Sequence, residues 1–237
     1  MQSKFLTAEW RNLVMANYVV PPSILQPFLP NGTELDYWEG KCYISLVGFM
    51  FLNTKVLGLP IPFHQNFEEV NLRFYVRYFE DGEWKRGVVF LKEIVPKSAI
   101  TFVANNLYGE HYVTLPMFHQ WQDSDNTKTV KYAWKTEDKW QSIKVETEKE
   151  PSPLLENSEA EFITQHYWGY TKINDKRTSE YQVEHPSWRI LNVKDYSIDY
   201  TAKNFYGAPF DDIMRTNPVS VFMAEGSEII VRKGISL

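Results

Sequence analysis

The stretch "HQNFEEVNLRFYVRY" at residues 64–78 alternates apolar and polar residues along most of its length. The apolar parity carries Val70, Leu72, Phe74 and Val76. The other parity carries Glu69, Asn71, Arg73, Tyr75 and Arg77. A period of two residues predicts a β-strand that places these sets on opposite faces. The polar face then looks either at bulk water or into a cavity.

The two environments give Glu69 and Arg73 different roles. In water they form an exposed pair worth at most ~1 kcal/mol, and the alternation taken alone favours this solvent-facing stripe. In a cavity Arg73 binds a carboxylate through two hydrogen bonds. Glu69 then acts as an acid or a base with a pKa raised by burial.

Other segments predict further strands and a few helices. Residues 41–53 are apolar on both parities, Asp81-Gly82 is a hairpin signal, and Glu225-Gly226 separates two β-runs. Three segments, "HYVTLPMFHQW", "TKTVKYAWKT" and "WQSIKVETE", read as a meander. Helices are expected after Pro21-Pro22, over 96–108, and from a cap at Asn157 or Ser158. This pattern predicts an α+β protein that is mostly β, with two or three short helices among roughly ten strands.

The acidic, proline-containing run at 147–163 is the best candidate for a domain boundary. The aromatic pattern resumes directly after it, so we favour a long surface loop over a linker. Residues 1–237 are therefore expected to form a single domain.

Charge and composition exclude several classes of partner. The net charge of −5, with interleaved lysines, argues against nucleic acid. Cys42 is the single cysteine and lies in an apolar run, which indicates an inert core residue. The N-terminus lacks a secretory pattern, and no apolar run reaches the ~18 residues of a membrane helix. We expect a cytoplasmic protein with no membrane partner.

Familiar catalytic motifs are missing. The sequence contains no HExxH, GxSxG, GxGxxG or P-loop, and its five histidines are scattered. A metal site would need ligands from positions far apart in the chain. The predicted site includes no metal and no cofactor.

Four successive segments are similar to a known family. They begin with "WRNLVMANYVVPPSILQPFLPNGTELDYWEGKCYISLVGFMF" and "FHQNFEEVNLRFYVRY", and continue with "GVVFLKEIVPKSAITFVANNLYGEHYVTLPM" and "YQVEHPSW". Together they resemble the YqjF-like bacterial proteins of the acetoacetate decarboxylase-like superfamily. The resemblance implies a largely antiparallel, cone-like barrel or large sheet around a pocket. It also implies that Glu69, Asn71 and Arg73 point inward.

The resemblance to the decarboxylase itself rests on "FEEV" and "SAITFVANNLYGEHYV". It aligns Glu69 with a glutamate of the active-site cavity. It aligns Tyr112 and Val113 with two adjacent lysines, the first of which forms a Schiff base. Neither residue forms an imine, so decarboxylation by that mechanism is not expected unless a lysine such as Lys92 or Lys172 substitutes.

Other residues near these pieces are candidates by the same resemblance. Tyr112 is expected to donate its hydroxyl near the pocket, and His111 is the nearest proton shuttle. His185 also matches a family pattern, with a structural role beside Pro186 and Trp188 as the alternative.

Three functional hypotheses follow. The first is a lyase- or hydratase-like enzyme acting on an organic acid, with Glu69 as acid or base, Arg73 as the carboxylate clamp, and Asn71, His111 and Tyr112 as binding residues. The second is a non-catalytic protein that binds a small organic acid. The third is a scaffold that forms a homo-oligomer through aromatic surface and keeps a vestigial pocket.

Overall fold

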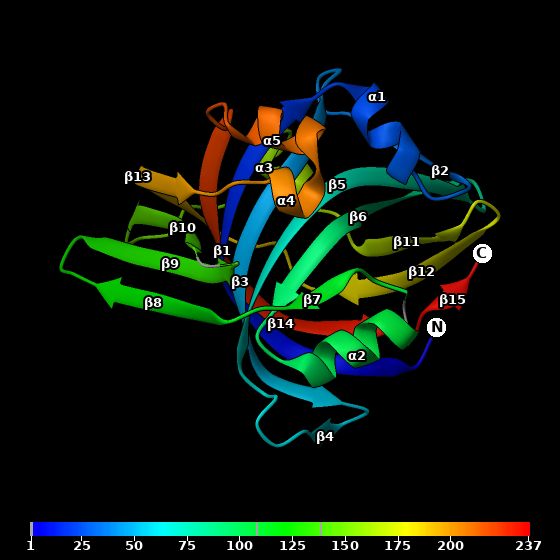
Figure 1. The fold of residues 1–237 in the computed structure, drawn as a ribbon, viewed down its shortest axis with the longest axis horizontal. Coiled ribbons are helices and arrows are strands. Elements are labelled where there is room, and N and C mark those ends of the chain that lie inside the picture. The colour runs from blue at the N-terminus through cyan, green and yellow to red at the C-terminus, as the bar shows by residue number, and fades with distance from the viewer. Residues whose placement is uncertain (1, 108, 138) are drawn as a thin grey trace.

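One mixed, mostly antiparallel sheet of 15 strands dominates the computed structural model, which describes residues 2–107, 109–137 and 139–237 (Figure 1). Its central strands are β1 (Lys4–Val20), β3 (Cys42–Val56), β5 (Phe67–Glu80), β6 (Glu83–Val95), β11 (Trp168–Asn174), β12 (Arg177–Glu184) and β14 (Ser220–Arg232). These strands pair in the order β12-β11-β6-β5-β3-β1-β14, and β12 also pairs with β14. The row of strands therefore closes on itself into a ring.

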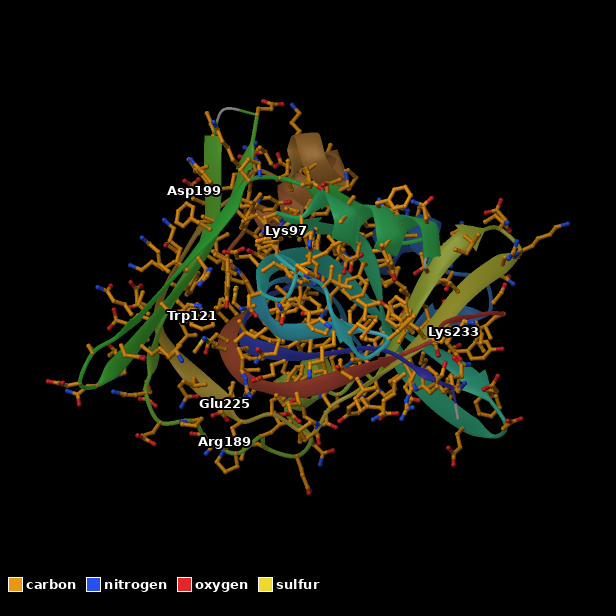
Figure 2. All side chains as sticks on the ribbon, turned by 90° about the horizontal axis from the view of Figure 1, so that it is seen from below. Lys97, Trp121, Arg189, Asp199, Glu225 and Lys233 are labelled. Atoms are coloured by element: carbon orange, nitrogen blue, oxygen red, sulfur yellow. The ribbon has the colours of Figure 1, made fainter. Side chains whose placement is uncertain are left out.

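The sheet continues beyond β14 as the expected meander. Its strands are β13 (Ile190–Asp199), β10 (Lys139–Glu148), β9 (Thr127–Thr136) and β8 (Met117–Asp123). Short strands complete the sheet: β2 (Thr33–Leu35), β4 (Leu59–Pro60), β7 (Tyr112–Thr114) and β15 (Ile235–Ser236). Seen from below in Figure 2, the central strands curl around a middle filled with side chains, and the meander bearing Trp121 lies to one side.

The helices are short and lie in the connections. They are α1 (Pro22–Leu25), the 3₁₀ turn η1 (Gln26–Phe28), α2 (Ser98–Leu107), α3 (Glu159–Thr164), α4 (Lys203–Tyr206) and α5 (Ala208–Met214). The helices expected after Pro21-Pro22, over 96–108 and after Ser158 are all present. Ser158 caps α3 because its Oγ accepts a 3.1 Å hydrogen bond from the Glu161 amide.

Local sequence signals explain the neighbouring turns. Asp81 and Gly82 both have positive φ, as a two-residue hairpin between β5 and β6 requires. The 147–163 run connects strands of one sheet, and its Ser152 forms a bridge to Ile190 at the start of β13. The C-terminal region differs from its prediction, since β14 is one continuous strand through Gly226 rather than two runs.

Both faces of β5 are buried, which decides between the two interpretations of its alternation. Its apolar parity, including Leu72 and Phe74, packs in one hydrophobic cluster on one side of the sheet. Tyr75, on the polar parity, packs in a second cluster with aromatic residues of neighbouring strands. Glu69 is 2% exposed and Arg73 is 8% exposed. The solvent-facing stripe is therefore wrong.

Within the part of the chain that the structure describes, none of the helices combines the length and the apolar character needed to cross a lipid bilayer.

Candidate functional site

A cavity of about 350 Å³ lies against the polar face of β5. Most of its wall is aromatic or aliphatic and includes Trp10, Phe49, Phe51, Phe67, Phe90, Trp168 and Trp188. Its polar wall includes Thr54, His64, Glu69, Asn71, Arg73, Glu93, Glu110, Tyr112, Thr164, His166, Tyr181 and His185. Ile100 and Val103 of α2 bound another part of the wall. The cavity thus combines an apolar body with a few convergent polar groups, as small-molecule sites do.

Strand register aligns the polar groups in a row across three strands. Asn71 of β5 pairs with Glu93 of β6, and Glu93 pairs with Tyr112 of β7. Glu69 and Glu110 each lie two residues from a member of this row, so period two gives them the same face. We call Glu69, Glu93 and Glu110 the carboxyl cluster; each is buried.

Glu69 is held by two hydrogen bonds. Nδ2 of Asn71 donates to its Oε1 at 2.9 Å, and the Tyr112 hydroxyl donates to its Oε2 at 3.0 Å. Burial raises the pKa of Glu69 to about 7, although both hydrogen bonds and the charge of Arg73 favour its ionised form. A carboxyl group with this pKa exchanges its proton near neutral pH.

The other two carboxyl groups favour the protonated state as well. Burial, and then repulsion from Glu110 and Glu69, raise the pKa of Glu93 well above its usual range. Burial raises the pKa of Glu110 to about 7. At neutral pH the carboxyl cluster therefore carries protons on part of its carboxyl groups.

Among the described residues of the cavity wall, Arg73 is the one arginine or lysine. No carboxylate of the described residues lies within 4.0 Å of its guanidinium. Nη2 donates weakly to the Ile163 carbonyl at 3.4 Å and approaches the Met15 sulfur at 4.0 Å. The guanidinium carbon lies 5.7 Å from the centroid of the Tyr75 ring, and Nε has no hydrogen-bond partner among the described residues. A buried guanidinium without an ion-pair partner destabilises the protein unless an anion binds to it.

Two neutral histidines complete the polar wall. Burial lowers the pKa of His166 to about 4, and its Nε2 lies 3.1 Å from Oδ2 of Asp36, which also pairs with Arg86 at 2.6 Å. Burial lowers the pKa of His185 to about 4 as well. Both rings therefore offer the cavity hydrogen-bonding groups without a charge at neutral pH.

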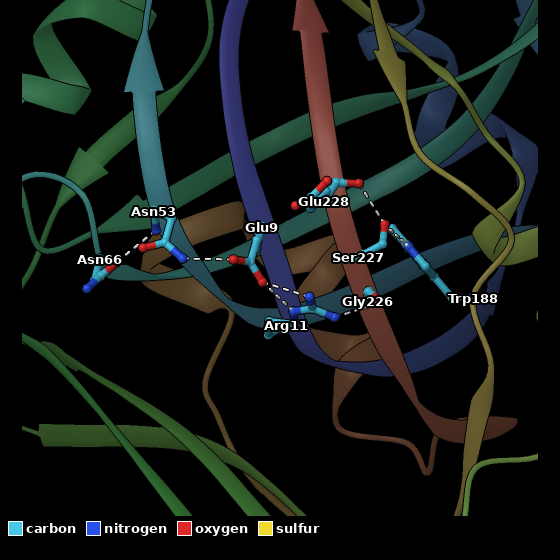
Figure 3. A network of polar contacts seen from close by, with 8 residues as sticks. All are labelled: Glu9, Arg11, Asn53, Asn66, Trp188, Gly226, Ser227 and Glu228. Carbon is cyan, nitrogen blue, oxygen red and sulfur yellow. Dashed lines mark hydrogen bonds and ion pairs between the residues drawn. The ribbon is translucent and has the colours of Figure 1, made fainter. Parts of the chain in front are cut away.

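The His185 wall is fixed from behind. The His185 ring stacks on Trp188 with centroids 4.0 Å apart and planes 17° apart, and its Nδ1 lies 2.9 Å from the Pro186 carbonyl. Figure 3 shows Nε1 of Trp188 donating to Oγ of Ser227 at 2.8 Å. These contacts fit the structural alternative for His185.

The network of Figure 3 also joins three strands of the ring. Arg11 of β1 donates to Glu9 and to the carbonyl of Gly226 in β14. Asn53 of β3 donates to Oε1 of Glu9 at 2.7 Å. These bonds lock β3, β1 and β14 together beside the Trp188 wall.

A β-bulge decides which side chain of β6 enters the cavity. Leu72 pairs with Lys92 but Arg73 pairs with Phe90, so Leu91 is an extra residue on β6. Phe90 lines the cavity, and strict alternation would bring Lys92 in after it. The bulge instead brings in Glu93.

The lysines proposed as substitutes lie elsewhere. Lys92 donates to the Phe205 carbonyl at 2.9 Å, and Lys172 pairs with Asp175 at 3.1 Å. Among the described residues that line the cavity there is no lysine. The expectation that Lys92 or Lys172 could supply the missing amine is therefore not supported by this geometry.

The structure brings four of the five predicted site residues together: Glu69, Asn71, Arg73 and Tyr112. His111 is the exception. Its side chain is exposed and does not line the cavity, because consecutive residues of an extended segment alternate. The prediction of a proton shuttle at His111 is therefore corrected.

Sequence reasoning missed Glu93, Glu110, His166 and Tyr181. None belongs to a recognisable motif. The parity of Glu93 is reversed by the bulge, and Glu110 precedes its strand. The row of Asn71, Glu93 and Tyr112 becomes visible only when the strand sequences "NLRF", "LKEIV" and "YVT" are aligned in the register in which β5, β6 and β7 pair.

Comparison with solved structures places the fold in the acetoacetate decarboxylase-like class. Acetoacetate decarboxylase from Legionella pneumophila superposes with a TM-score of 0.68 at 13% identity, covering 98% of this chain and 87% of that one. The enduracididine biosynthesis enzyme MppR, complexed with pyruvate, gives a TM-score of 0.66 at 11% identity and covers 100% and 91%. These likenesses show the fold.

Residues 7–228 match the DUF2071 family, described as "uncharacterized conserved protein", and the chain belongs to that family. The uncharacterized protein YqjF of Bacillus subtilis is 27% identical over 190 residues. That alignment covers 78% of this chain and 74% of the relative. The resemblance to YqjF-like proteins is thereby confirmed.

Proposed function

We propose that the cavity binds a small organic acid, with its carboxylate on Arg73, and that Glu69 and Tyr112 transfer protons on the bound molecule. The reaction is of the lyase or hydratase kind and forms no imine with the protein.

The buried guanidinium of Arg73, which forms no ion pair with a carboxylate of the described residues, is the observation that carries this proposal. Its Nε has no partner and its Nη2 makes only a 3.4 Å contact to a carbonyl. A carboxylate is the planar anion that a guanidinium binds through two parallel hydrogen bonds. The apolar walls around it exclude water and strengthen such a pair.

Acid–base chemistry is assigned to Glu69 because its proton exchanges near neutral pH. The Tyr112 hydroxyl, 3.0 Å from Oε2, stabilises the ionised carboxylate and orients it. A general base of this kind removes a proton beside a carbonyl or from water, and returns it as an acid. Because no lysine lines the described cavity, the carbonyl of the substrate stays free.

Arg73→Met tests the binding step, since methionine keeps the apolar stem and removes the charge. We expect the variant to be as stable as the parent or more stable when empty, and to lose carboxylate-induced thermal stabilisation. Arg77→Met is the matched control, because Arg77 shares the parity of Arg73 but pairs with Glu34 outside the cavity. Equal binding by the parent and Arg73→Met would refute the carboxylate role.

Catalysis is separated from binding by isotope exchange. The protein is incubated in D₂O with keto and hydroxy acids, and NMR follows deuterium incorporation next to the carbonyl. Glu69→Gln should abolish exchange while leaving the stabilisation by the acid intact. Binding without exchange or turnover in the parent would favour the alternative function, a non-catalytic organic-acid-binding protein.

A further inference from the structure

Part of the cavity is not used by the proposed function. Glu93 and Glu110 face the cavity beside Glu69, and Oε2 of Glu93 accepts no hydrogen bond. A carboxyl cluster alone does not define a ligand, because buried acids are neutral when protonated.

Asn71 supplies an independent observation. Its side chain is 1% exposed and its Nδ2 donates to Glu69, which leaves Oδ1 buried without a partner. An amide oxygen is an acceptor in every protonation state. Asn71 lies in the row with Glu93, so this end of the cavity places Oδ1 of Asn71 beside Oε2 of Glu93, two acceptor atoms that receive no hydrogen bond from the described residues. The hydroxyl groups of Thr171 and Tyr181 favour the ionised form of Glu110.

Arg73 does not satisfy these acceptors. It follows Asn71 by two residues on the same face, yet no Glu oxygen of the cluster lies within the 4.0 Å of an ion pair. The cavity therefore keeps a cationic pole at Arg73 and an acceptor pole at Asn71, Glu93 and Glu110. Separated poles in a water-poor cavity are complementary to a ligand with separated charges of opposite sign.

We infer that the ligand is a dipolar organic acid, which places its carboxylate on Arg73 and a protonated amine or guanidine on Asn71, Glu93 and Glu110. The inference rests on the proposed function, because it keeps the carboxylate on Arg73. The apolar wall requires an aliphatic or aromatic portion between the two charged ends. Among the described residues no three His, Cys, Asp or Glu side chains have the arrangement of a metal site, which favours an organic cation at the acceptor pole.

Three matched probes separate the two poles. The dipolar probe is para-(aminomethyl)benzoate. In para-ethylbenzoate a methyl group replaces the ammonium group, and in para-methylbenzylamine a methyl group replaces the carboxylate. The pair ε-aminocaproate and heptanoate repeats the comparison on a flexible chain. Isothermal titration calorimetry measures each affinity.

We expect the dipolar probe to bind at least about tenfold more tightly than para-ethylbenzoate, because one ion pair in a low-dielectric site is worth this factor or more. Binding should also release protons, seen as a dependence of the measured heat on the buffer, because the cation ionises carboxyl groups that are protonated in the empty cavity. Equal or weaker binding of both dipolar probes relative to their apolar partners would overturn the inference.

Variants localise the effect and separate the two proposals. Glu93→Gln and Glu110→Gln keep the side-chain shape and should remove the preference for the dipolar probe, while para-ethylbenzoate binds as before. Glu68→Gln is the control, since Glu68 is adjacent to Glu69 but lies outside the cavity wall. If apolar acids bind through Arg73 without any dipolar preference, only the further inference fails. If none of the acids binds, the proposed function fails with it.

Discussion

The hydroxyl group of Tyr112 donates a 3.0 Å hydrogen bond to Oε2 of Glu69. By resemblance, Tyr112 stands where acetoacetate decarboxylases carry the Schiff-base lysine, and Glu69 stands where they carry a cavity glutamate. The side chains at the two positions are in contact in this protein. Where the decarboxylases have a lysine nucleophile, this chain has the Tyr112 hydroxyl group, which donates a hydrogen bond. The cavity therefore holds a buried carboxyl group beside a hydroxyl group at these two positions.

Removing this donor is expected to move the proton of Glu69. In Tyr112→Phe the ionised carboxylate loses one hydrogen bond, so its pKa should rise further above about 7. NMR titration of carboxyl-labelled glutamate measures the change. Tyr167→Phe is the control, because the Tyr167 hydroxyl donates to Gln165 outside the cavity. An unchanged Glu69 titration in Tyr112→Phe would contradict the contact.

Glu69→Gln should change how stability depends on pH. The folded pKa of Glu69, about 7, exceeds the ordinary value of 4.5, so the folded state holds the proton more tightly than the unfolded state. The contribution of Glu69 to stability therefore falls as pH rises from 4.5 to about 7, and the glutamine variant lacks this contribution while it keeps those of Glu93 and Glu110. Relative to the parent, the variant should gain up to about 3 kcal/mol over this range.

Chemical denaturation at several pH values measures this difference. His166 and His185, whose pKa values are lowered by burial, contribute with the opposite slope, but they are present in both proteins and cancel in the difference. Glu68→Gln should show no comparable gain. Parallel stability profiles for the parent and Glu69→Gln would show that Glu69 is solvated and not buried.

Local sequence signals predicted the parts of the fold that depend on near neighbours. Asp81-Gly82 set the hairpin, Ser158 the cap of α3, and the apolar run at 41–53 a strand buried on both faces. The inward orientation of Glu69 could not be read from alternation, because period two separates the faces of a strand without saying what covers each. Family resemblance supplied that information.

The remaining site residues depend on long-range packing. Regular alternation after Phe90 would point Lys92 into the cavity. The bulge at Leu91 points Glu93 into it instead. Glu110 becomes buried because β7 pairs in parallel with β6, a contact that no turn signal announces. One extra residue thus changed the charge of a cavity wall.

Introducing an amine at position 112 should allow imine formation in the cavity. Tyr112→Lys places a primary amine beside Glu69 in the cavity, so treatment with a keto acid and borohydride should give a stable adduct at residue 112. The parent should give none in the cavity. His111→Lys is the matched control, since that neighbouring side chain is exposed, and peptide mass mapping distinguishes the two positions. Equal labelling of both variants would mean that the keto acid does not react preferentially with residue 112, and would contradict its position in the binding cavity.

Gly226→Ala should disrupt the antiparallel pairing of β14 with β1, where Gly226 pairs with Arg11. Gly226 has φ of +84°, and a Cβ there would collide with the Trp10 carbonyl oxygen. We expect a loss of about 3 kcal/mol or more, because backbone strain and a clash add. Gly58→Ala shares the positive φ of +82° but meets nothing within 4 Å, so only the backbone cost of about 1 kcal/mol is expected. Urea denaturation of both variants separates the two contributions. Equal losses would argue against the close approach.

The pairing of β1 with β14 has a consequence for biosynthesis. During translation β1 can pair with β3 early, but its other neighbour, Ser220–Arg232, is synthesised much later, after every other strand of the ring. Until then the nascent protein carries an open strand edge with apolar residues such as Val14 and Met15, which are fully buried in the finished fold. Slow synthesis of Ser220–Arg232, or termination before it, should therefore yield aggregation or a need for chaperones.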